Sequence, residues 1–226
     1  MSNKNLLIIV FFSLQLMFCD DESQQIILTE YNSELSISEN LNNGVSVEEI
    51  VENTSIASLY GLEYGGGYIF HVDQNDFSLL IATDFSEIGN VAWGDVFSLD
   101  TSAEIGSGRE NTDLIIEGNL NDNSINGTEH GNDNYAFKIV DDLVYNNHDD
   151  WFIPSSGSMS AIFDNVHSNG FGNFDEGLVY WSSTKQGYFP YVMSFDLSLG
   201  WGGQSFLGAC TQVNGCLLYT SPSPRD

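Results

Sequence analysis

The chain has 226 residues, and its 32 acidic and 5 basic side chains give a formal net charge of −27. Nucleic acid and anionic membrane surfaces are therefore poor partners, because the sequence has no cationic cluster that could meet phosphate groups. Hydrophobic residues make up 42% and aromatic residues 13% of the chain, which excludes a largely disordered protein. We expect the acidic surface to favour solubility in a salty environment, with divalent cation binding as the alternative.

An export signal is the first feature along the chain. Residues 6–18 form an apolar run of about a dozen residues, shorter than the roughly 20 that a membrane-spanning helix needs. Residues 16–19 resemble the cleavage box of bacterial lipoproteins, in which the cysteine becomes the lipidated first residue of the mature protein. Phe18 departs from that pattern, because a small residue normally precedes the cysteine. The alternative is a plain signal peptide with a chance cysteine.

The predicted location follows from the residues around the cleavage box. We predict that residues 1–19 are a lipoprotein-type signal peptide and that Cys19 is the site of lipid attachment. The acidic residues 20–22 resemble the tag of lipoproteins displayed on the outer surface of Gram-negative cells. The sequence therefore predicts an outer-membrane or cell-surface lipoprotein that contacts the membrane only through its lipid anchor. Without lipidation, the protein would be extracellular.

Residues 216–226 form a tail that differs abruptly from the rest of the chain and holds two of its 4 prolines. The tail also matches, residue for residue, one reading frame of a transposase adapter used in shotgun sequencing. We expect it to be non-native and the natural C-terminus to be missing, and we exclude it from fold reasoning. Cys216 then drops out and Cys19 belongs to the signal, so Cys210 has no partner for a disulfide.

The first half of the mature chain carries local signals for a helix and a hairpin. Residues 20–43 are polar and acidic without a sustained period, which predicts a tether. Ser46 and Glu49 have the spacing of a capping box and predict a short helix through residue 53. A glycine turn at 65–67 leads into two strand-like runs, 68–73 and 78–83, which predict a β-hairpin.

The second half of the mature chain carries signals for helices followed by strands. Glycines at 106–108 predict a turn that opens a short helix through residue 116, followed by a long loop over 118–134. Apolar residues at three- and four-residue spacing predict an amphipathic helix over 135–144. A second helix is expected from Ser155 to residue 170, and strands at 178–183 and 188–195, where Pro190 favours an edge. Strands, helices and strands in that order predict an α+β domain over residues 44–215.

An ordered set of motifs resembles a known domain: the C-terminal domain of bacterial collagen-like surface proteins. This domain of unknown function is usually grouped with the C-type-lectin-like fold. The motifs lie at residues 60–70, 93–94, 105–108, 111–112, 150–155 and 180–183, and the resemblance runs from about residue 44 to 202. It implies a single C-type-lectin-like domain with short antiparallel strands and two main helices.

The chain departs from the family pattern in two places. Ser158 and Met159 stand where the family usually has Glu-Leu, which removes a carboxylate. The family's closing strand has no clear counterpart before Cys216, which fits a domain that lacks its natural last strand. Because the terminal strands pair in C-type-lectin-like folds, we expect the chain to have an open sheet edge.

Two sets of residues could form a binding site. Trp151 and Trp181 could stack on a sugar, although tryptophans within apolar strand and turn motifs are more often core residues, which is the interpretation we favour. Asp149 and Asp150, with 141–142 upstream, could bind calcium, although their spacing alone does not bring them together. For these acids we favour a solvated surface, and no cofactor other than calcium is suggested.

Signals for catalysis are weaker. His148 beside Asp149, with Ser155 nearby, would suit a hydrolase, but no G-x-S-x-G elbow surrounds any serine, and Ser155 is better placed to cap a helix. No H-E-x-x-H motif suggests zinc, and the glycines at 106–108 do not make a phosphate loop. A related fold includes the enzyme that makes formylglycine, which needs reactive cysteines, whereas Cys210 stands alone.

These observations predict a cell-surface, lipid-tethered binding or adhesion module that is not an enzyme, with a glycan or the extracellular matrix as ligand. That expectation rests on the resemblance of the fold. The alternatives are a secreted enzyme of unknown reaction, supported by His148 and its polar neighbours, and a structural envelope protein without a small ligand.

Overall fold

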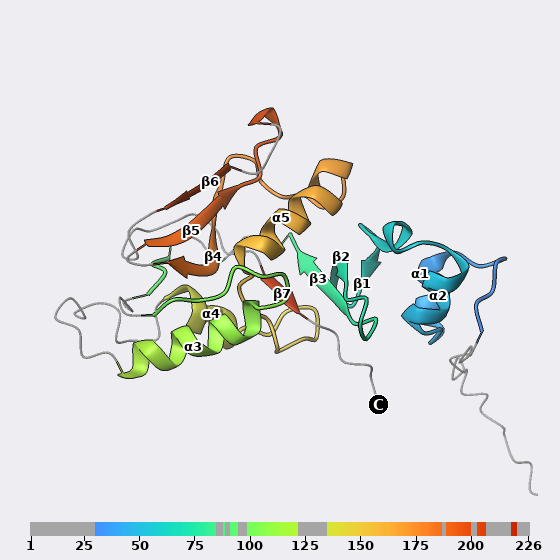
Figure 1. Cartoon of the computed structure of the whole chain (residues 1–226), viewed down its shortest axis with the longest axis horizontal. Helices are drawn as coiled ribbons and strands as arrows, with labels where there is room; N and C mark the ends of the chain where they lie inside the picture. Colours follow the sequence, from blue (N-terminus) through green and yellow to red (C-terminus); the bar gives the residue numbers. More distant parts are fainter. Residues whose placement is uncertain are drawn as a thin grey trace, which may run out of the picture.

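The computed structural model describes residues 30–84, 88, 91–94, 99–121, 135–186, 189–199, 203–206 and 218–220. These residues form a mixture of helices and two small antiparallel sheets (Figure 1), which confirms the predicted α+β class. The helices are α1 (Ile37–Asn42), α2 (Val47–Asn53), α3 (Gly108–Asn121), α4 (Ala136–Asp141) and α5 (Ser156–Asn165), with 3-10 turns η1 (Ile56–Leu59), η2 (His167–Asn169) and η3 (Leu197–Leu199).

The first sheet is built around the β-hairpin that the sequence predicts, and the second around the two strands predicted at 178–183 and 188–195. The first sheet has the order β1 (Glu63–Tyr64), β2 (Gly67–Val72), β3 (Leu79–Thr83) and β7 (Leu218–Thr220). The second sheet has the order β4 (Val179–Gln186), β5 (Phe189–Ser194) and β6 (Gly203–Phe206). All neighbouring strands are antiparallel, so short turns are enough to connect the hairpins.

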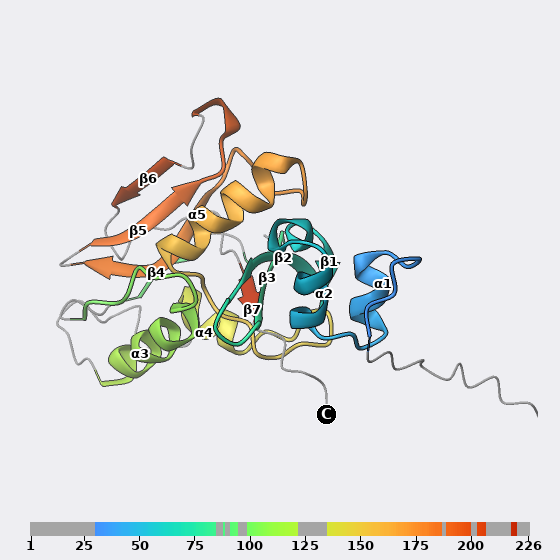
Figure 2. The ribbon, with the colours of Figure 1, turned by 45° about the vertical axis from the view of Figure 1, so that its right-hand side comes forward.

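Helix α5 joins the two sheets, because it contacts β2 on one side and β4 and β5 on the other (Figure 2). Its Met159, Ile162 and Phe163 are buried with Phe70 of the first sheet and Phe195, which follows β5. A second cluster lies between α3, α4 and β4, and a third lies between α1, α2 and the first sheet. The spacing of the apolar residues in α5 is that of a helix with one buried face, as expected from the sequence.

The tether predicted for residues 20–43 extends too far along the chain. Helix α1 lies within that range and begins with a capping box formed by Ser36 and Glu39. Asn40 and Leu41 are buried, and the Asn40 side-chain amide donates to three backbone carbonyls. The helix is anchored by a buried amide and one leucine, which is why its sequence shows no apolar period.

Two further predictions need adjustment at their ends. Ser46 caps α2 as predicted, but the Glu49 carboxylate accepts from the backbone N–H of Tyr31 and the amide of Asn53, and no return bond to Ser46 is seen among the described contacts. Helix α3 continues to residue 121, beyond the predicted end at 116. It takes up the start of the predicted loop over 118–134, most of which lies outside the described residues.

The sheet edge that we expected to be open is occupied. Leu218–Thr220 pairs antiparallel with β3, with Ile81 opposite Thr220. This strand belongs to the tail that the sequence assigns to adapter. A β3 edge with unpaired N–H and C=O groups accepts an extended segment of almost any sequence, because the pairing uses only backbone atoms.

Candidate functional site

A tight turn between β1 and β2 forms one wall of a pocket that is lined by described residues. Tyr64 pairs with Gly67, and the two residues between them, Gly65 and Gly66, have φ angles of 57° and 88°. Positive φ at both central positions defines a type I′ turn, which glycine adopts without strain. At Gly67 a Cβ atom would lie 2.6 Å from the carbonyl oxygen of Ala82, so the third glycine allows close approach of β3.

A second turn of the same type follows α4. Tyr145 and His148 exchange two backbone hydrogen bonds, of 2.9 and 3.0 Å, and the residues between them are Asn146 and Asn147, with φ angles of 51° and 62°. Asparagine is the residue that tolerates this conformation best after glycine. The Asn-Asn pair therefore fixes a tight turn that directs Tyr145 toward the first sheet.

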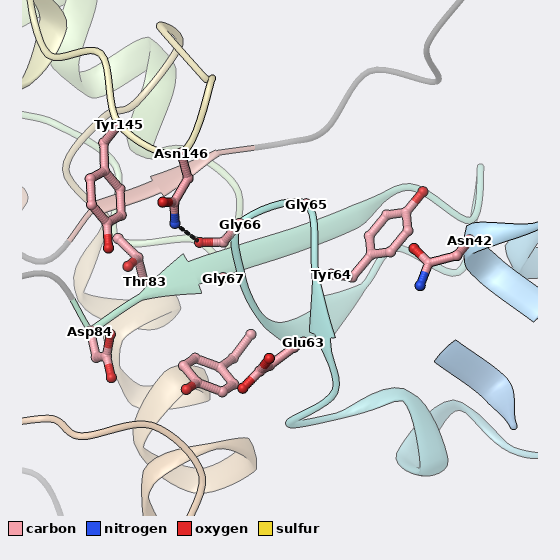
Figure 3. Close-up of a pocket in the computed structure, with 11 residues that line it drawn as sticks. Asn42, Glu63, Tyr64, Gly65, Gly66, Gly67, Thr83, Asp84, Tyr145 and Asn146 are labelled. Carbon is pink, nitrogen blue, oxygen red and sulfur yellow. Dashed lines mark hydrogen bonds between the residues drawn. The ribbon is translucent and has the colours of Figure 1, made fainter. Parts of the chain in front are cut away.

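The two turns contact each other directly. The side-chain amide of Asn146 donates a hydrogen bond of 2.9 Å to the carbonyl oxygen of Gly66 (Figure 3). The turns pack so closely that a Cβ atom on Gly66 would lie 2.9 Å from the Cβ of Asn146. This contact brings Tyr145 beside the hairpin, although 80 residues separate the two bonded positions.

The pocket beside these turns has a volume of about 420 Å³. Figure 3 shows Tyr145 and Asn146 at one end, the glycine turn in the middle, and Tyr64 beside Asn42 at the other end. Its lining is dominated by tyrosine and carboxylate side chains: Asn42, Glu63, Tyr64, Gly65, Gly66, Gly67, Tyr68, Thr83, Asp84, Tyr145 and Asn146. No lysine, arginine or histidine is among these lining residues.

Tyr68 is the centre of a polar cluster in this pocket. Burial raises the pKa of Tyr68, and the charges of Asp84 and Glu63 raise it further, as does the hydrogen bond between its hydroxyl and Glu63. The hydroxyl therefore stays protonated at neutral pH and donates to the Glu63 carboxylate. Asp84 is held from outside the pocket, because its Oδ2 accepts from the backbone N–H of Asn173 at 2.7 Å.

The tryptophans considered as a sugar platform are core residues, which confirms the interpretation we favoured. Trp151 and Trp181 are fully buried, as is Trp93. Each of the three indole N–H groups donates to a backbone carbonyl at 2.8 to 3.0 Å. Stacking on a ligand would require these rings to leave the core.

The structure does not gather the four candidate calcium ligands. Asp141 lies 3.3 Å from Arg109 and 3.6 Å from Lys138, and Lys138 also contacts Asp142 at 2.6 Å. Asp149 is exposed, and Asp150 Oδ1 lies 3.8 Å from His148 Nδ1. Within the described ranges no group of three or more His, Cys, Asp or Glu side chains could hold a metal ion.

Lys185 is the third basic residue in the described part of the chain. Its side chain lies in β4 and is fully buried, and its Nζ donates to the carbonyl oxygen of Leu99 at 2.8 Å. Burial lowers the pKa of Lys185, and the charge of Asp100 opposes that shift. Lys185 and the paired Arg109 and Lys138 therefore all have structural contacts away from the pocket.

Ser155 caps α5, as the sequence predicts. Its hydroxyl accepts from the backbone N–H of Ser158 at 3.2 Å and donates to the carbonyl oxygen of Glu104 at 2.6 Å. The side chain is fully buried, so it is not placed as a nucleophile. His148 packs edge-on against Trp151, with 5.8 Å between ring centroids, and gives the hydrolase alternative no further support.

The residues that replace the expected Glu-Leu pair are also accounted for by packing. Ser158 is buried and its hydroxyl accepts from the backbone N–H of Gly106 at 3.1 Å. Met159 is a fully buried core residue of α5. The pair therefore joins the turn at 106–108 to α5 and leaves no carboxylate at this position.

Cys19 and Cys210 lie outside the described residues. Within the described residues no helix is long and apolar enough to cross a membrane. No protein-family model matches the chain, and a search of curated proteins gives no match.

No motif in the sequence predicts a binding site at the pocket residues. Glu63 and Tyr64 precede the glycine turn, Tyr68 and Asp84 lie in or directly after the predicted hairpin, and Tyr145 lies far from all of them in sequence. The available signal was a pair of dipeptides that favour type I′ turns, one on each side of the pocket. Only their contact in the folded chain shows that the tyrosines share one site.

Proposed function

We propose that this protein is a cell-surface, lipid-tethered binding module whose pocket, on the β1–β2 hairpin, takes a glycan. The observation that carries the proposal is the open pocket of about 420 Å³ with three half-buried tyrosines and two carboxylates. The volume is within the range of about 300 to 1,000 Å³ that is common for small-ligand sites. The resemblance to C-type-lectin-like domains supports the same proposal.

The chemistry of the lining suits a sugar. Aromatic rings offer flat apolar surfaces to the C–H faces of a pyranose, and Tyr64, Tyr68 and Tyr145 supply three of them. Sugar hydroxyl groups need both hydrogen-bond donors and acceptors, which the carboxylate of Glu63 and the hydroxyl of Thr83 provide. The lining extends along the hairpin from Asn42 to the second turn (Figure 3), a shape that fits an oligosaccharide better than a single sugar.

A glycan array probed with the mature chain tests this proposal. We expect binding to at least one glycan class, and we expect Tyr64→Ala to abolish most of it because the change removes a ring from the pocket. Tyr191→Ala is the matched control, since Tyr191 is a half-buried tyrosine of the second sheet. Parallel arrays with calcium and with a chelator report whether the ion contributes.

Four outcomes would contradict the proposal. Binding only to matrix proteins would move the ligand to another class of macromolecule. Binding to nothing would favour a structural envelope protein, and hydrolysis of a glycan that is lost in His148→Ala would favour the enzyme. Equal loss of binding in both tyrosine variants would show that the pocket is not the site.

The membrane anchor is tested separately. We expect cells that express the full chain to incorporate a labelled fatty acid into the protein, and Cys19→Ser to abolish that labelling because it removes the thiol. Protease treatment of intact cells then reports whether the domain faces outward. An unlabelled protein found in the medium would show that the signal peptide is cleaved without lipidation.

A further inference from the structure

The pocket has charge of only one sign. Its ionisable lining groups that are charged at neutral pH are Glu63 and Asp84, and both are negative. The cations of the described chain are committed elsewhere, since Arg109 and Lys138 pair with aspartates of α3 and α4 or the residue after it, and Lys185 is buried in β4. Covering these carboxylates removes water from them, and an ammonium group compensates for that loss more fully than neutral hydroxyl groups do, because it adds a charge interaction to the hydrogen bond.

The aromatic rings reinforce the preference of the carboxylates. The Tyr68 hydroxyl is hydrogen-bonded to Glu63 and lies within the influence of the charge of Asp84, and these three side chains line the pocket together with Tyr145. Figure 3 shows Glu63, Asp84 and Tyr145 approaching this region from β1, the end of β3 and the second turn. Tyrosine faces attract cations through their quadrupole, and nearby carboxylates add a direct charge interaction.

Two side chains of the pocket are held in place by the protein itself. Asp84 is oriented by its hydrogen bond from the Asn173 backbone, and Tyr145 by the turn that Asn146 fastens to Gly66. Because hydrogen bonds within the protein already fix the Asp84 carboxylate and the turn that carries Tyr145, a ligand would not have to order them on binding. Preorganisation of this kind increases affinity without additional contacts.

We propose that the pocket recognises an ammonium group, presented by an amino sugar whose amine is not acetylated. This inference rests on the proposed function, because it specifies the glycan that the same pocket takes. Sulfated and carboxylated glycans are disfavoured by the same two carboxylates, and by the net charge of −27 on the whole chain. N-acetylation of the sugar would remove the positive charge that interacts with Glu63 and Asp84.

Calorimetry with two matched oligosaccharides tests the inference on the mature chain. One is the tetramer of β-1,4-linked glucosamine, and the other is the tetramer of N-acetylglucosamine, each in a buffer acidic enough to keep the free amines protonated. We expect the glucosamine tetramer to bind at least roughly tenfold more tightly, the effect expected for a cation–π contact combined with an ion pair. Higher salt should weaken this binding, because the interaction is between charges.

A charge-matched pair of variants separates the pocket from the acidic surface in general. Glu63→Gln removes one pocket carboxylate and should weaken the glucosamine tetramer roughly tenfold, with little effect on the acetylated tetramer. Glu110→Gln removes an exposed carboxylate of α3, far from the pocket in sequence and absent from its lining, and should change neither affinity. Unchanged melting temperatures would show that both variants fold.

The outcomes distinguish this inference from the proposed function. Tighter binding of the acetylated tetramer would overturn the ammonium inference and leave glycan binding standing. Equal weakening in Glu63→Gln and Glu110→Gln would show diffuse attraction of a polycation and overturn it as well. If neither tetramer binds, tetramethylammonium decides: binding that depends on Glu63 supports the ammonium site without a sugar, and no binding overturns both proposals.

Discussion

The aromatic side chains of this protein form two groups that use their polar atoms in opposite ways. The tryptophans of the core are fully buried, and their N–H groups bond to backbone carbonyls of the protein. The pocket tyrosines Tyr64, Tyr68 and Tyr145 are half-buried and line an open cavity. The tryptophan motifs that carry the family resemblance therefore stabilise the fold, while the tyrosines beside two tight turns are available to a ligand.

Among the variants that test this comparison, Trp181→Ala should have the largest effect on stability. Trp181 packs in the cluster between α3, α4 and β4, and its removal leaves a cavity and an unsatisfied carbonyl at Val91. We expect the free energy of unfolding to fall by about 3–5 kcal/mol in denaturant titrations. Trp181→Phe should cost less, because it retains most of the ring volume. A loss below about 1 kcal/mol in Trp181→Ala would show that the ring is not a core residue.

Alkaline pH distinguishes a core tyrosine from a pocket tyrosine. Burial raises the pKa of Tyr180 to about 12, against an ordinary value of 10.0. Because the pKa of Tyr180 is higher in the folded than in the unfolded chain, its protonated hydroxyl contributes to stability. That contribution is complete below pH 10 and is lost as the pH rises toward 12. We expect a loss on the order of 2–3 kcal/mol across that window, measured by denaturant titration.

Tyr180→Phe is the control for the alkaline titration. The variant lacks the titrating hydroxyl, so its stability should fall less steeply between the same pH values. The slope that remains comes in part from Tyr60 and Tyr68, whose pKa values burial also raises. An identical slope in the variant and the wild type would contradict the assignment to Tyr180.

The smallest expected effect on stability is that of Tyr68→Phe. The variant loses only the hydroxyl that bonds to the exposed Glu63 carboxylate, so the free energy of unfolding should change by less than about 1 kcal/mol. Binding of the glucosamine tetramer should still weaken measurably in calorimetry, because Glu63 is no longer held. Tyr180→Phe should show the reverse, with altered stability and unaltered binding, and any other result would remove the distinction between the two groups.

The parts of the fold that the sequence predicts are those determined by short-range signals. The hairpin at 68–83 is marked by alternating apolar residues and a polar turn, and Ser46 and Ser155 cap helices at the predicted positions. These features depend on residues within four positions of each other. The burial of the tryptophans was predictable for a related reason, because their neighbours in the chain are apolar.

The features that the sequence did not predict depend on contacts between distant segments. Helix α1 has no apolar period, because one of its two buried residues is a hydrogen-bonded asparagine, Asn40, instead of an apolar side chain. Tyr145 lies beside the hairpin because Asn146 bonds to Gly66, and no local pattern specifies that contact. The C-type-lectin-like fold itself remains a prediction, because what the structure establishes is the α+β class.

The placement of the lysine and arginine residues affects how readily extracellular proteases can cleave the protein. Trypsin-like proteases cut after lysine and arginine, and cleavage requires a backbone that can open locally. In the described ranges these residues are Arg109, Lys138 and Lys185, which lie in α3, α4 and β4. Each is thus held in regular structure, and the loops of the described domain offer such enzymes nothing to cut. A protein displayed on a cell surface would gain a long lifetime among digestive enzymes from an amino-acid composition that also sets its charge.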